Sequence, residues 1–259
     1  MSRAPERFPY AHLLWEMAYA EVRLRDQGSL LGFLWTLLHP ALMFAVLYGL
    51  FIHWLGRFVP DYAAYLLIGL VLWNFFARAT SYAMTSLRRY QGLLRNYRFP
   101  REIPILASVA AVQWSSLLEL LVLSAVLAML GHPPDRRWLE LPALLLILLL
   151  LVSGLSLFLA VLAAEFQDME RVWEIVSTAL FYLTPVFYPL SLIESVKRGW
   201  LMLNPLAVIL TAARGAALGT PLPSWRALCA LLVLGGAACA MGVWTVRRLT
   251  FRLADKLMV

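Results

Sequence analysis

Long apolar runs separated by short polar stretches recur along the whole chain. Because about 20 apolar residues in a helix can cross the hydrocarbon core of a bilayer, a run of this length predicts a membrane-spanning helix. Six runs are this long, and they predict spans at 33–55, 62–83, 103–130, 141–164, 172–190 and 227–246. The pattern therefore predicts an all-α integral membrane protein with six transmembrane helices.

The segment 8–26 has a different pattern, with apolar residues on one face of a helix and polar residues away from it. Trp15 and Tyr19 are the amphipathic aromatic residues that anchor such helices at a membrane surface. We therefore predict an interfacial helix before the first span. The alternative is an ordinary soluble amphipathic helix that leads into the membrane.

A second amphipathic segment, 85–98, lies between the second and third predicted spans. Its apolar residues recur at helical spacing, and Pro100 disfavours helical backbone at Phe99, so we expect a short helix that ends there. Arginines surround the stripe and have two interpretations. They can set membrane topology and contact anionic lipid, or they can belong to a docking element for a soluble partner. The apolar stripe consists of Leu87, Tyr90, Leu94 and Tyr97.

The segment 191–224 is apolar but interrupted, because Asn204-Pro205 and Arg214 break its longest run. Broken backbone is tolerated in a membrane where protein or water covers it, so this pattern predicts a pair of short re-entrant or interfacial helices. Lys197, Arg198 and Arg214 could meet a phosphate or an acidic sugar, or they could contact lipid headgroups.

Composition and charge agree with a membrane protein. Of the 259 residues, 62% are hydrophobic and 14% are charged, whereas soluble domains have about 25% charged residues. If both termini are cytoplasmic, 15 of the 22 Lys and Arg residues fall on the inner side, as the positive-inside rule requires. Topology thus accounts for the net charge of +7, and we expect no nucleic-acid partner.

Five blocks of sequence carry a resemblance to a known family. They are GSLLGFLWTLLHPALM (28–43), GLVLWNFFARA (69–79), FPREIP (99–104), LTPVFYPL (183–190) and LNPLAVILTAARG (203–215). In this order they resemble the permease subunits of polysaccharide-exporting ABC transporters of the ABC-2 type, which export O-antigen, capsule or teichoic acid chains. His39 departs from the pattern, since the family usually has Asn before the Pro.

The resemblance implies a bacterial inner-membrane exporter of a lipid-linked or lipid-anchored polysaccharide. Two permease chains would form the channel, the 191–224 segment would hold two periplasmic gate helices, and the 85–98 helix would dock on an ATPase subunit. The residues it assigns to ATPase coupling are Leu87, Arg88, Tyr90, Leu94, Arg95, Tyr97, Phe99, Pro100, Arg101 and Glu102. Those it places at the gate are Lys197, Arg198, Asn204, Pro205 and Arg214.

The residues themselves agree with a separate motor. The chain has no G-x-x-x-x-G-K-[ST] phosphate loop, and its only lysines are Lys197 and Lys256. We therefore expect no enzyme activity and no cofactor on this chain, with ATP and Mg²⁺ bound by two partner ATPase subunits. His39 and His53 are 14 residues apart and have no Cys or carboxylate partner at ligand spacing, so we expect no metal.

A conduit for sugar chains would be lined by aromatic rings, because sugar rings present C–H faces that pack on them. The aromatic belt at the membrane surface is the alternative for any one residue. Glu119 lies in mid-span, where a charged group is costly, and is either channel-facing or hydrogen-bonded to Ser115, Ser116 or a neighbouring helix. The candidate conduit residues are Trp35, His39, Trp73, Phe75, Phe76, Glu119, Tyr182 and Tyr188.

Three other functions are weighed against this one. An ABC-2 exporter of another amphiphile, such as a lipid or a drug, would share the same spans. An ion-coupled secondary transporter would need polar sites at the midplane and internal repeats, but the sequence offers only Glu119 and no convincing repeat. A membrane-embedded enzyme would need paired acidic or His-rich motifs at a membrane edge, and no loop has a convincing one.

Overall fold

The computed structural model describes residues 10–26, 32–97, 99–194 and 199–256, and these form helices without a strand. In chain order the elements are α1 (Tyr10–Asp26), α2 (Gly32–Leu55), α3 (Tyr62–Met84), α4 (Ser86–Arg89), α5 (Gln91–Asn96), α6 (Glu102–Met129), η1 (Arg136–Glu140), α7 (Leu141–Glu165), α8 (Met169–Leu183), η2 (Leu190–Leu192), α10 (Pro205–Leu218) and α11 (Trp225–Lys256). Within the described part, five helices are long and apolar enough to cross a membrane: α2, α3, α6, the η1–α7 unit and α11.

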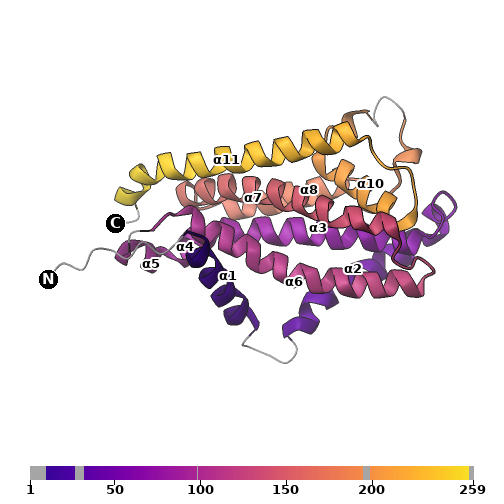
Figure 1. The fold of residues 1–259 in the computed structure, drawn as a ribbon, viewed down its shortest axis with the longest axis horizontal. Helices are drawn as coiled ribbons and strands as arrows, with labels where there is room; N and C mark the ends of the chain where they lie inside the picture. The colour runs from indigo at the N-terminus through magenta and orange to yellow at the C-terminus, as the bar shows by residue number, and fades with distance from the viewer. Residues whose placement is uncertain (1–9, 27–31, 98, 195–198, 257–259) are drawn as a thin grey trace.

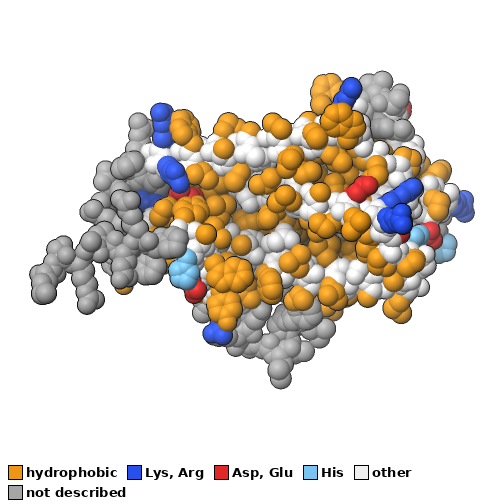
Figure 2. Space-filling model, viewed as in Figure 1, with side chains coloured by type: hydrophobic (Ala, Val, Ile, Leu, Met, Phe, Trp, Pro, Cys, Tyr) orange, Lys and Arg blue, Asp and Glu red, His pale blue; other side chains and the backbone are white. Residues whose placement is uncertain are grey.

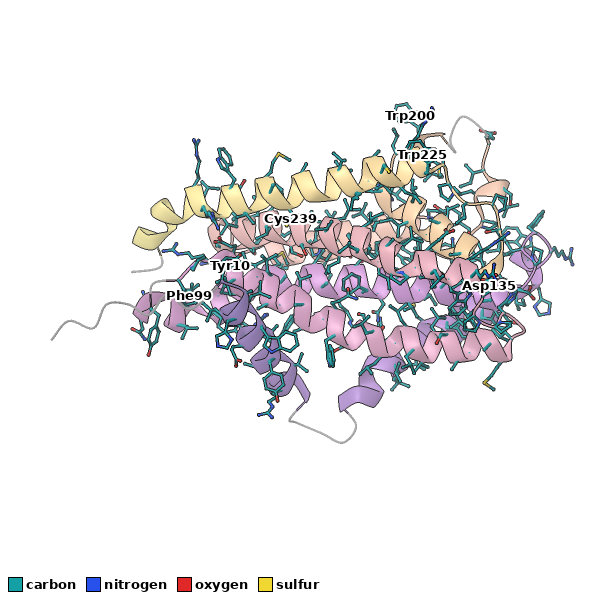
Figure 3. All side chains as sticks on the ribbon, in the orientation of Figure 1. Tyr10, Phe99, Asp135, Trp200, Trp225 and Cys239 are labelled. Atoms are coloured by element: carbon teal, nitrogen blue, oxygen red, sulfur yellow. The ribbon has the colours of Figure 1, made fainter. Side chains whose placement is uncertain are left out.

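The long helices lie side by side along the long axis of the molecule (Figure 1). α4 and α5 lie at one end, which we call the α4–α5 end, and α10 lies near the other, the α10 end (Figure 1). Tyr10 and Phe99 mark the first end, and Asp135 and Trp225 mark the second (Figure 3). Charged side chains gather toward the two ends and hydrophobic ones cover the surface between them (Figure 2), as expected for a chain that crosses a bilayer.

Small residues let α7 and α11 pack closely. A Cβ atom on Gly154 of α7 would lie 2.7 Å from Ala238 Cβ, and one on Gly242 of α11 would lie 2.7 Å from Leu157 Cβ. Glycine at both positions removes these clashes, and close backbone approach is a common way for helices to associate within lipid. α11 therefore lies along α7 for much of its length (Figure 1).

The fifth predicted span, 172–190, was expected to be one helix, but its helix ends at Leu183. α8 stops at Leu183 because the next residue, Thr184, precedes Pro185 and has extended backbone (φ −94°, ψ 138°), the conformation that a following proline favours. Its 15 residues give a length of about 22 Å, less than the roughly 30 Å of a hydrocarbon core. The other predicted spans fall within α2, α3, α6, α7 and α11 to within a residue.

The segment 85–98 is two short helices and not the single helix that was predicted. α4 and α5 meet at Tyr90, whose backbone leaves the helical region (φ −96°, ψ 14°). Leu87, the first residue of the predicted stripe, is only 3% exposed and belongs to the main core. The stripe therefore begins by packing on the protein itself.

α1 is a helix, and one side of it packs on α6. Met17 and Ala18 are buried against Ile103 and Ala107, while Trp15 on the other side is 62% exposed. The location of α1 at a membrane surface remains a prediction, and the outward Trp15 agrees with it.

A buried carboxylate ties α1 to three other helices. Glu21 of α1 is 4% exposed and accepts hydrogen bonds from the Tyr82 hydroxyl of α3, from Nη2 of Arg89, the last residue of α4, at 3.1 Å, and from Ser108 Oγ of α6 at 3.2 Å. Burial tends to raise the pKa of Glu21, but the bonds from Tyr82 and Arg89 outweigh it and the pKa is lowered from 4.5.

This lowered pKa predicts an acid-labile contribution to stability. The folded pKa of Glu21 lies below its unfolded value of 4.5, so its stabilisation is fully present above about pH 4.5 and disappears as the pH falls through the folded pKa. We expect Glu21→Gln to lower the thermal unfolding midpoint of the purified protein at neutral pH. The gap between the two proteins should close as the solution is acidified.

Glu16→Gln, on the exposed side of the same helix, is the control and should match the wild type throughout. A gap between wild type and Glu21→Gln that is constant with pH would contradict the assignment.

Candidate functional site

A surface groove of about 180 Å³ lies between α2, α3 and α8, and we call it the α2–α8 groove. It brings together three predicted conduit residues from three helices: His39 of α2, Trp73 of α3 and Tyr182 of α8. Its other lining residues are Pro40, Met43, Leu70, Asn74, Ala77, Ser177, Thr178 and Phe181. The wall therefore combines aromatic rings with hydroxyl, amide and imidazole groups, the mixture that hydrogen-bonds and packs against sugars.

Aromatic rings in mutual contact form one wall of the groove. The Phe181 ring packs edge-on against both Trp73 and Tyr182, with centroid distances of 5.5 and 5.4 Å. It also lies 5.8 Å from the ring of Phe187. Such pairs stabilise aromatic clusters beyond the effect of burial alone. Tyr182 is 61% exposed, so its ring is the part of the cluster that a ligand can reach.

Behind the groove, Asn74 leads to a buried ion pair. Its Nδ2 donates to Glu119 Oε2 at 3.2 Å, and Arg78 Nη1 donates to Glu119 Oε1 at 2.5 Å. Glu119 is 2% exposed, so it does not face a channel. The structure supports the hydrogen-bonded interpretation of this residue, with partners on the neighbouring helix α3, and the pair has no net charge.

Four of the predicted conduit residues lie elsewhere or are not described. Phe75 and Phe76 are 3% and 5% exposed and belong to the core, so neither lines the groove. Tyr188 is half-buried, and its hydroxyl donates to the backbone oxygen of Tyr182 at 3.1 Å. The side chain of Trp35 is outside the described part of the structure.

The backbone after α8 forms a turn whose carbonyls are satisfied by side chains, and we call 184–188 the carbonyl turn. Arg214 of α10 donates from Nη1 to Pro185 O at 2.7 Å and from Nη2 to Val186 O at 2.6 Å. Two tyrosines of α3 serve the next two carbonyls: Tyr62 donates to Phe187 O and Tyr65 to Tyr188 O, each at 3.0 Å. Four consecutive carbonyls thus have donors from α3 and α10.

Arg214 is a structural residue and not a cargo-binding one. It is 3% exposed, its guanidinium lies 3.5 Å from the centre of the Tyr65 ring, and its Nε donates to Tyr65 O at 3.2 Å. All its nitrogens have partners inside the protein. The two predicted roles, contact with a phosphate or acidic sugar and contact with lipid headgroups, are therefore wrong.

The other predicted gate residues start α10 or are not described. Asn204 is the N-cap of α10: its Oδ1 accepts from Leu206 N at 3.0 Å, and its Nδ2 donates to Thr184 Oγ1 at 2.8 Å. Pro205 is the first residue of α10, a position that suits proline. Asn204 thus connects α10 to the carbonyl turn, while Lys197 and Arg198 lie outside the described residues.

At the α4–α5 end, several predicted coupling residues face inward. Glu102 is 1% exposed, and its Oε1 accepts from Arg247 Nε of α11 at 2.6 Å. Arg88 pairs with Glu170 of α8 at 2.8 Å and donates to backbone oxygens at the end of α7. Leu87 is buried in the core. These three residues stabilise the chain itself, and burial keeps Leu87 and Glu102 from contact with a partner protein.

The remaining coupling residues are closer to the surface. Tyr90 and Phe99 pack against the α1–α6 cluster, and Leu94 packs against the main core. Tyr97 is 64% exposed, and next to this segment Leu93, which the sequence pattern did not single out, is 39% exposed. Arg95 and Pro100 are exposed, and Arg101 is half-buried. An apolar contact surface at this end therefore centres on Leu93 and Tyr97.

Among the described residues, no group of three His, Cys, Asp or Glu side chains is placed to hold a metal ion.

Comparison with known proteins gives a consistent picture. Residues 12–218 match the family described as ABC-2 type transporter. The chain is 31% identical to the O-antigen export system permease protein RfbA of Myxococcus xanthus, over 87% of this chain and 88% of that protein. It is 25% identical to the protein of the same name from Klebsiella pneumoniae over 91% of both chains. It is also 25% identical to the polysialic acid transport protein KpsM of Escherichia coli, over 76% of this chain and 77% of that protein.

The close packing of the carbonyl turn on Gly69 of α3 predicts the effect of a substitution there. A Cβ atom there would lie 2.4 Å from Arg214 Nη2 and 2.4 Å from Val186 O, so Gly69→Ala must displace the turn. We expect a loss of about 1–3 kcal/mol in stability, the usual cost of overpacking, seen as a lower thermal unfolding midpoint in detergent.

Gly49→Ala is the matched control, because the same Cβ in α2 would meet nothing within 4 Å. In a helix this change should be neutral or stabilising by up to about 1 kcal/mol. Equal midpoints for the two variants would mean that the close approach at Gly69 is not required.

Proposed function

The chain belongs to the ABC-2 type transporter family, and from this premise we propose that it is the channel-forming permease subunit of an ATP-driven polysaccharide exporter. The observation that carries the proposal is the match over most of the chain to permeases named for O-antigen export and polysialic acid transport. The cargo would be a polysaccharide that is linked to, or anchored on, a lipid.

The α2–α8 groove supports this cargo. Its aromatic face can pack on successive sugar rings, and its polar groups can hydrogen-bond hydroxyls without selecting one sugar. The Arg78–Glu119 pair behind Asn74 is neutral, so the groove floor presents no net charge that would hold an ionic cargo. A sliding polymer needs many weak contacts of this kind and no tight site.

A second copy of the chain would complete the conduit. The groove is open on the surface formed by α2 and α8, where Met43 is 39% exposed and Tyr182 is 61% exposed. One chain therefore supplies only part of a wall. Two chains that face each other through these helices would enclose a passage lined by both grooves, and we propose a homodimer for this reason.

ATP hydrolysis belongs to partner subunits in this proposal. The chain lacks a phosphate loop, so two ATPase subunits that bind ATP and Mg²⁺ would dock at the α4–α5 end, one on each permease. The exposed Leu93 and Tyr97 offer the apolar contact there. A movement of α4 and α5 would then be transmitted to the spans by the buried Leu87 and Glu102 and by the Arg88–Glu170 pair.

We further propose six crossings with both termini in the cytoplasm of a bacterium, in its inner membrane. α8 is too short to cross alone, so the carbonyl turn and the residues after it would complete the fifth crossing, and α10 would lie within the outer half of the bilayer. The charge distribution over the sequence supports this orientation.

One experiment tests the proposal as a whole. The chain is co-purified with candidate ATPases encoded in the same operon, and ATP hydrolysis is measured in lipid with the complex and with each part alone. We expect the complex to hydrolyse ATP and the permease alone to show none. Robust turnover by the permease without any partner would reject the proposal.

The docking surface gives a more specific prediction. Tyr97→Asp places a charge in the proposed apolar contact, and we expect the ATPase to dissociate while the permease still inserts and folds. Binding is measured by co-purification, and folding by the thermal unfolding midpoint. Tyr97→Phe is the control, since it keeps the ring and should retain the ATPase. Retention of the ATPase by Tyr97→Asp would exclude this surface.

The groove gives a prediction for transport. Tyr182→Ala removes the reachable ring, and we expect polysaccharide export by reconstituted complexes to slow about threefold to tenfold, equivalent to roughly 1 kcal/mol in the barrier. Trp114→Ala, which removes an exposed ring of α6 outside the groove, should leave export unchanged. Equal effects of the two substitutions would show that Tyr182 acts as an ordinary lipid-facing residue.

A further inference from the structure

A second cavity, of about 360 Å³, lies on the other side of α3 from the groove, and we call it the α6–α7 cavity. Side chains of α3, α6, η1, α7 and α10 form its walls, and of these only Ser124 and Trp138 carry a polar side-chain atom. Representative lining residues are Leu72, Leu120, Leu127, Leu144, Ile209 and Ala213. An apolar space of this kind does not hold ordered water, because water needs polar partners.

The mouth of the cavity opens on the outer surface of α6, which would face lipid in a membrane. Leu117 and Leu121 of α6 line it and are 45% and 65% exposed, and both belong to a helix that is long enough to cross the membrane. Hydrocarbon chains of the surrounding bilayer therefore have direct access. Entry of a chain would fill the space with the dispersion contacts that an empty cavity lacks.

Two arginines lie just beyond one end of the cavity, in a segment that also carries Asp135 and Glu140. Trp138 of η1 lines the cavity, and the preceding residues Arg136 and Arg137 are exposed at the α10 end. Arg137 Nη1 would lie 3.4 Å from a Cβ on Gly219, the C-cap of α10, so this guanidinium lies at the C-terminal end of the helix whose Ala213 and Ala217 line the cavity. Within the described residues neither arginine forms an ion pair.

The apolar cavity suits the hydrocarbon chain of a phospholipid, and the arginines beyond its end suit the phosphate of the same molecule. We propose that the α6–α7 cavity binds an acyl chain of an anionic membrane phospholipid, from the leaflet at the α10 end, with the phosphate at Arg136 and Arg137. An arginine pair near the surface attracts anionic headgroups, and the apolar walls receive the chain. The site goes beyond the proposed function, since it lies apart from the α2–α8 groove and binds a resident lipid and not the cargo.

The position of the site relates it to the groove. Leu72 lines the cavity and the next residue of α3, Trp73, lines the groove. An acyl chain in the cavity therefore supports α3 from the side opposite the aromatic wall.

The test uses a photoactivatable lipid in the full-length protein. Phosphatidylglycerol with a diazirine in one acyl chain is incorporated with phosphatidylcholine in nanodiscs, and the cross-linked residues are located by mass spectrometry. We expect adducts on the cavity-lining residues of α6 and α7. Ser124→Phe should lower this yield about tenfold by filling the mouth, equivalent to roughly 1.4 kcal/mol. Ala125→Phe, at the exposed neighbouring position outside the lining, should not.

A second pair of variants tests the headgroup, and it does not depend on how the cavity tolerates a larger residue. Arg137→Gln should lower the yield with the phosphatidylglycerol probe about fivefold, whereas Arg226→Gln, an exposed arginine at the start of α11, should not. The same diazirine on phosphatidylcholine should label the cavity more weakly than the anionic probe.

Adducts spread evenly over the lipid-facing residues, or equal effects of Ser124→Phe and Ala125→Phe, would overturn the cavity assignment. Equal labelling by both lipids, with no effect of Arg137→Gln, would overturn the headgroup site and leave Arg137 as a residue that only caps α10.

Discussion

Hydrocarbon offers no hydrogen bonds, so a polar group within the bilayer must find its partner inside the protein. The carbonyl turn meets this constraint where the chain leaves helical structure: four consecutive backbone oxygens, from Pro185 to Tyr188, accept from Arg214, Tyr62 and Tyr65. α8 can end early only because these donors replace the helical ones. The packing of α3, α8 and α10 around the turn follows from that exchange.

The same constraint explains the interior of the spans. Glu119 would be costly alone, but Arg78 and Asn74 each donate a hydrogen bond to it, and Arg78 balances its charge. The pair thereby fixes Asn74 in the wall of the α2–α8 groove. At the α4–α5 end, Glu21 is paired in the same way with Arg89, and Glu102 with Arg247. Buried charges in this protein therefore connect helices.

The sequence predicted what depends on local pattern. Run length located the long helices. Asn204-Pro205 and Arg214 were both interpreted as breaks, whereas Asn204 caps α10 and Arg214 lies within it. The sequence could not predict which side of an amphipathic segment faces the protein, so Leu87 was assigned to a docking stripe although it is buried. Contacts between distant positions were also beyond it: Asn74 and Arg78 lie 45 and 41 residues from Glu119, and periodicity carries no information at that separation. Of the residues that line the α2–α8 groove, the aromatic and family patterns of the sequence predicted only His39, Trp73 and Tyr182.

The proposed function depends on two features: Glu119 is paired with Arg78 within the spans, and the motor is on a separate chain. The most direct test is polysaccharide export by proteoliposomes that contain the permease and its ATPase, measured with ATP, with an imposed proton or sodium gradient, and with ionophores. The account predicts that export requires ATP, is unchanged by ionophores, and does not start when a gradient is imposed without ATP. Export driven by a gradient alone would contradict it, because Glu119 or another buried group would then have to release its partner and bind the coupling ion.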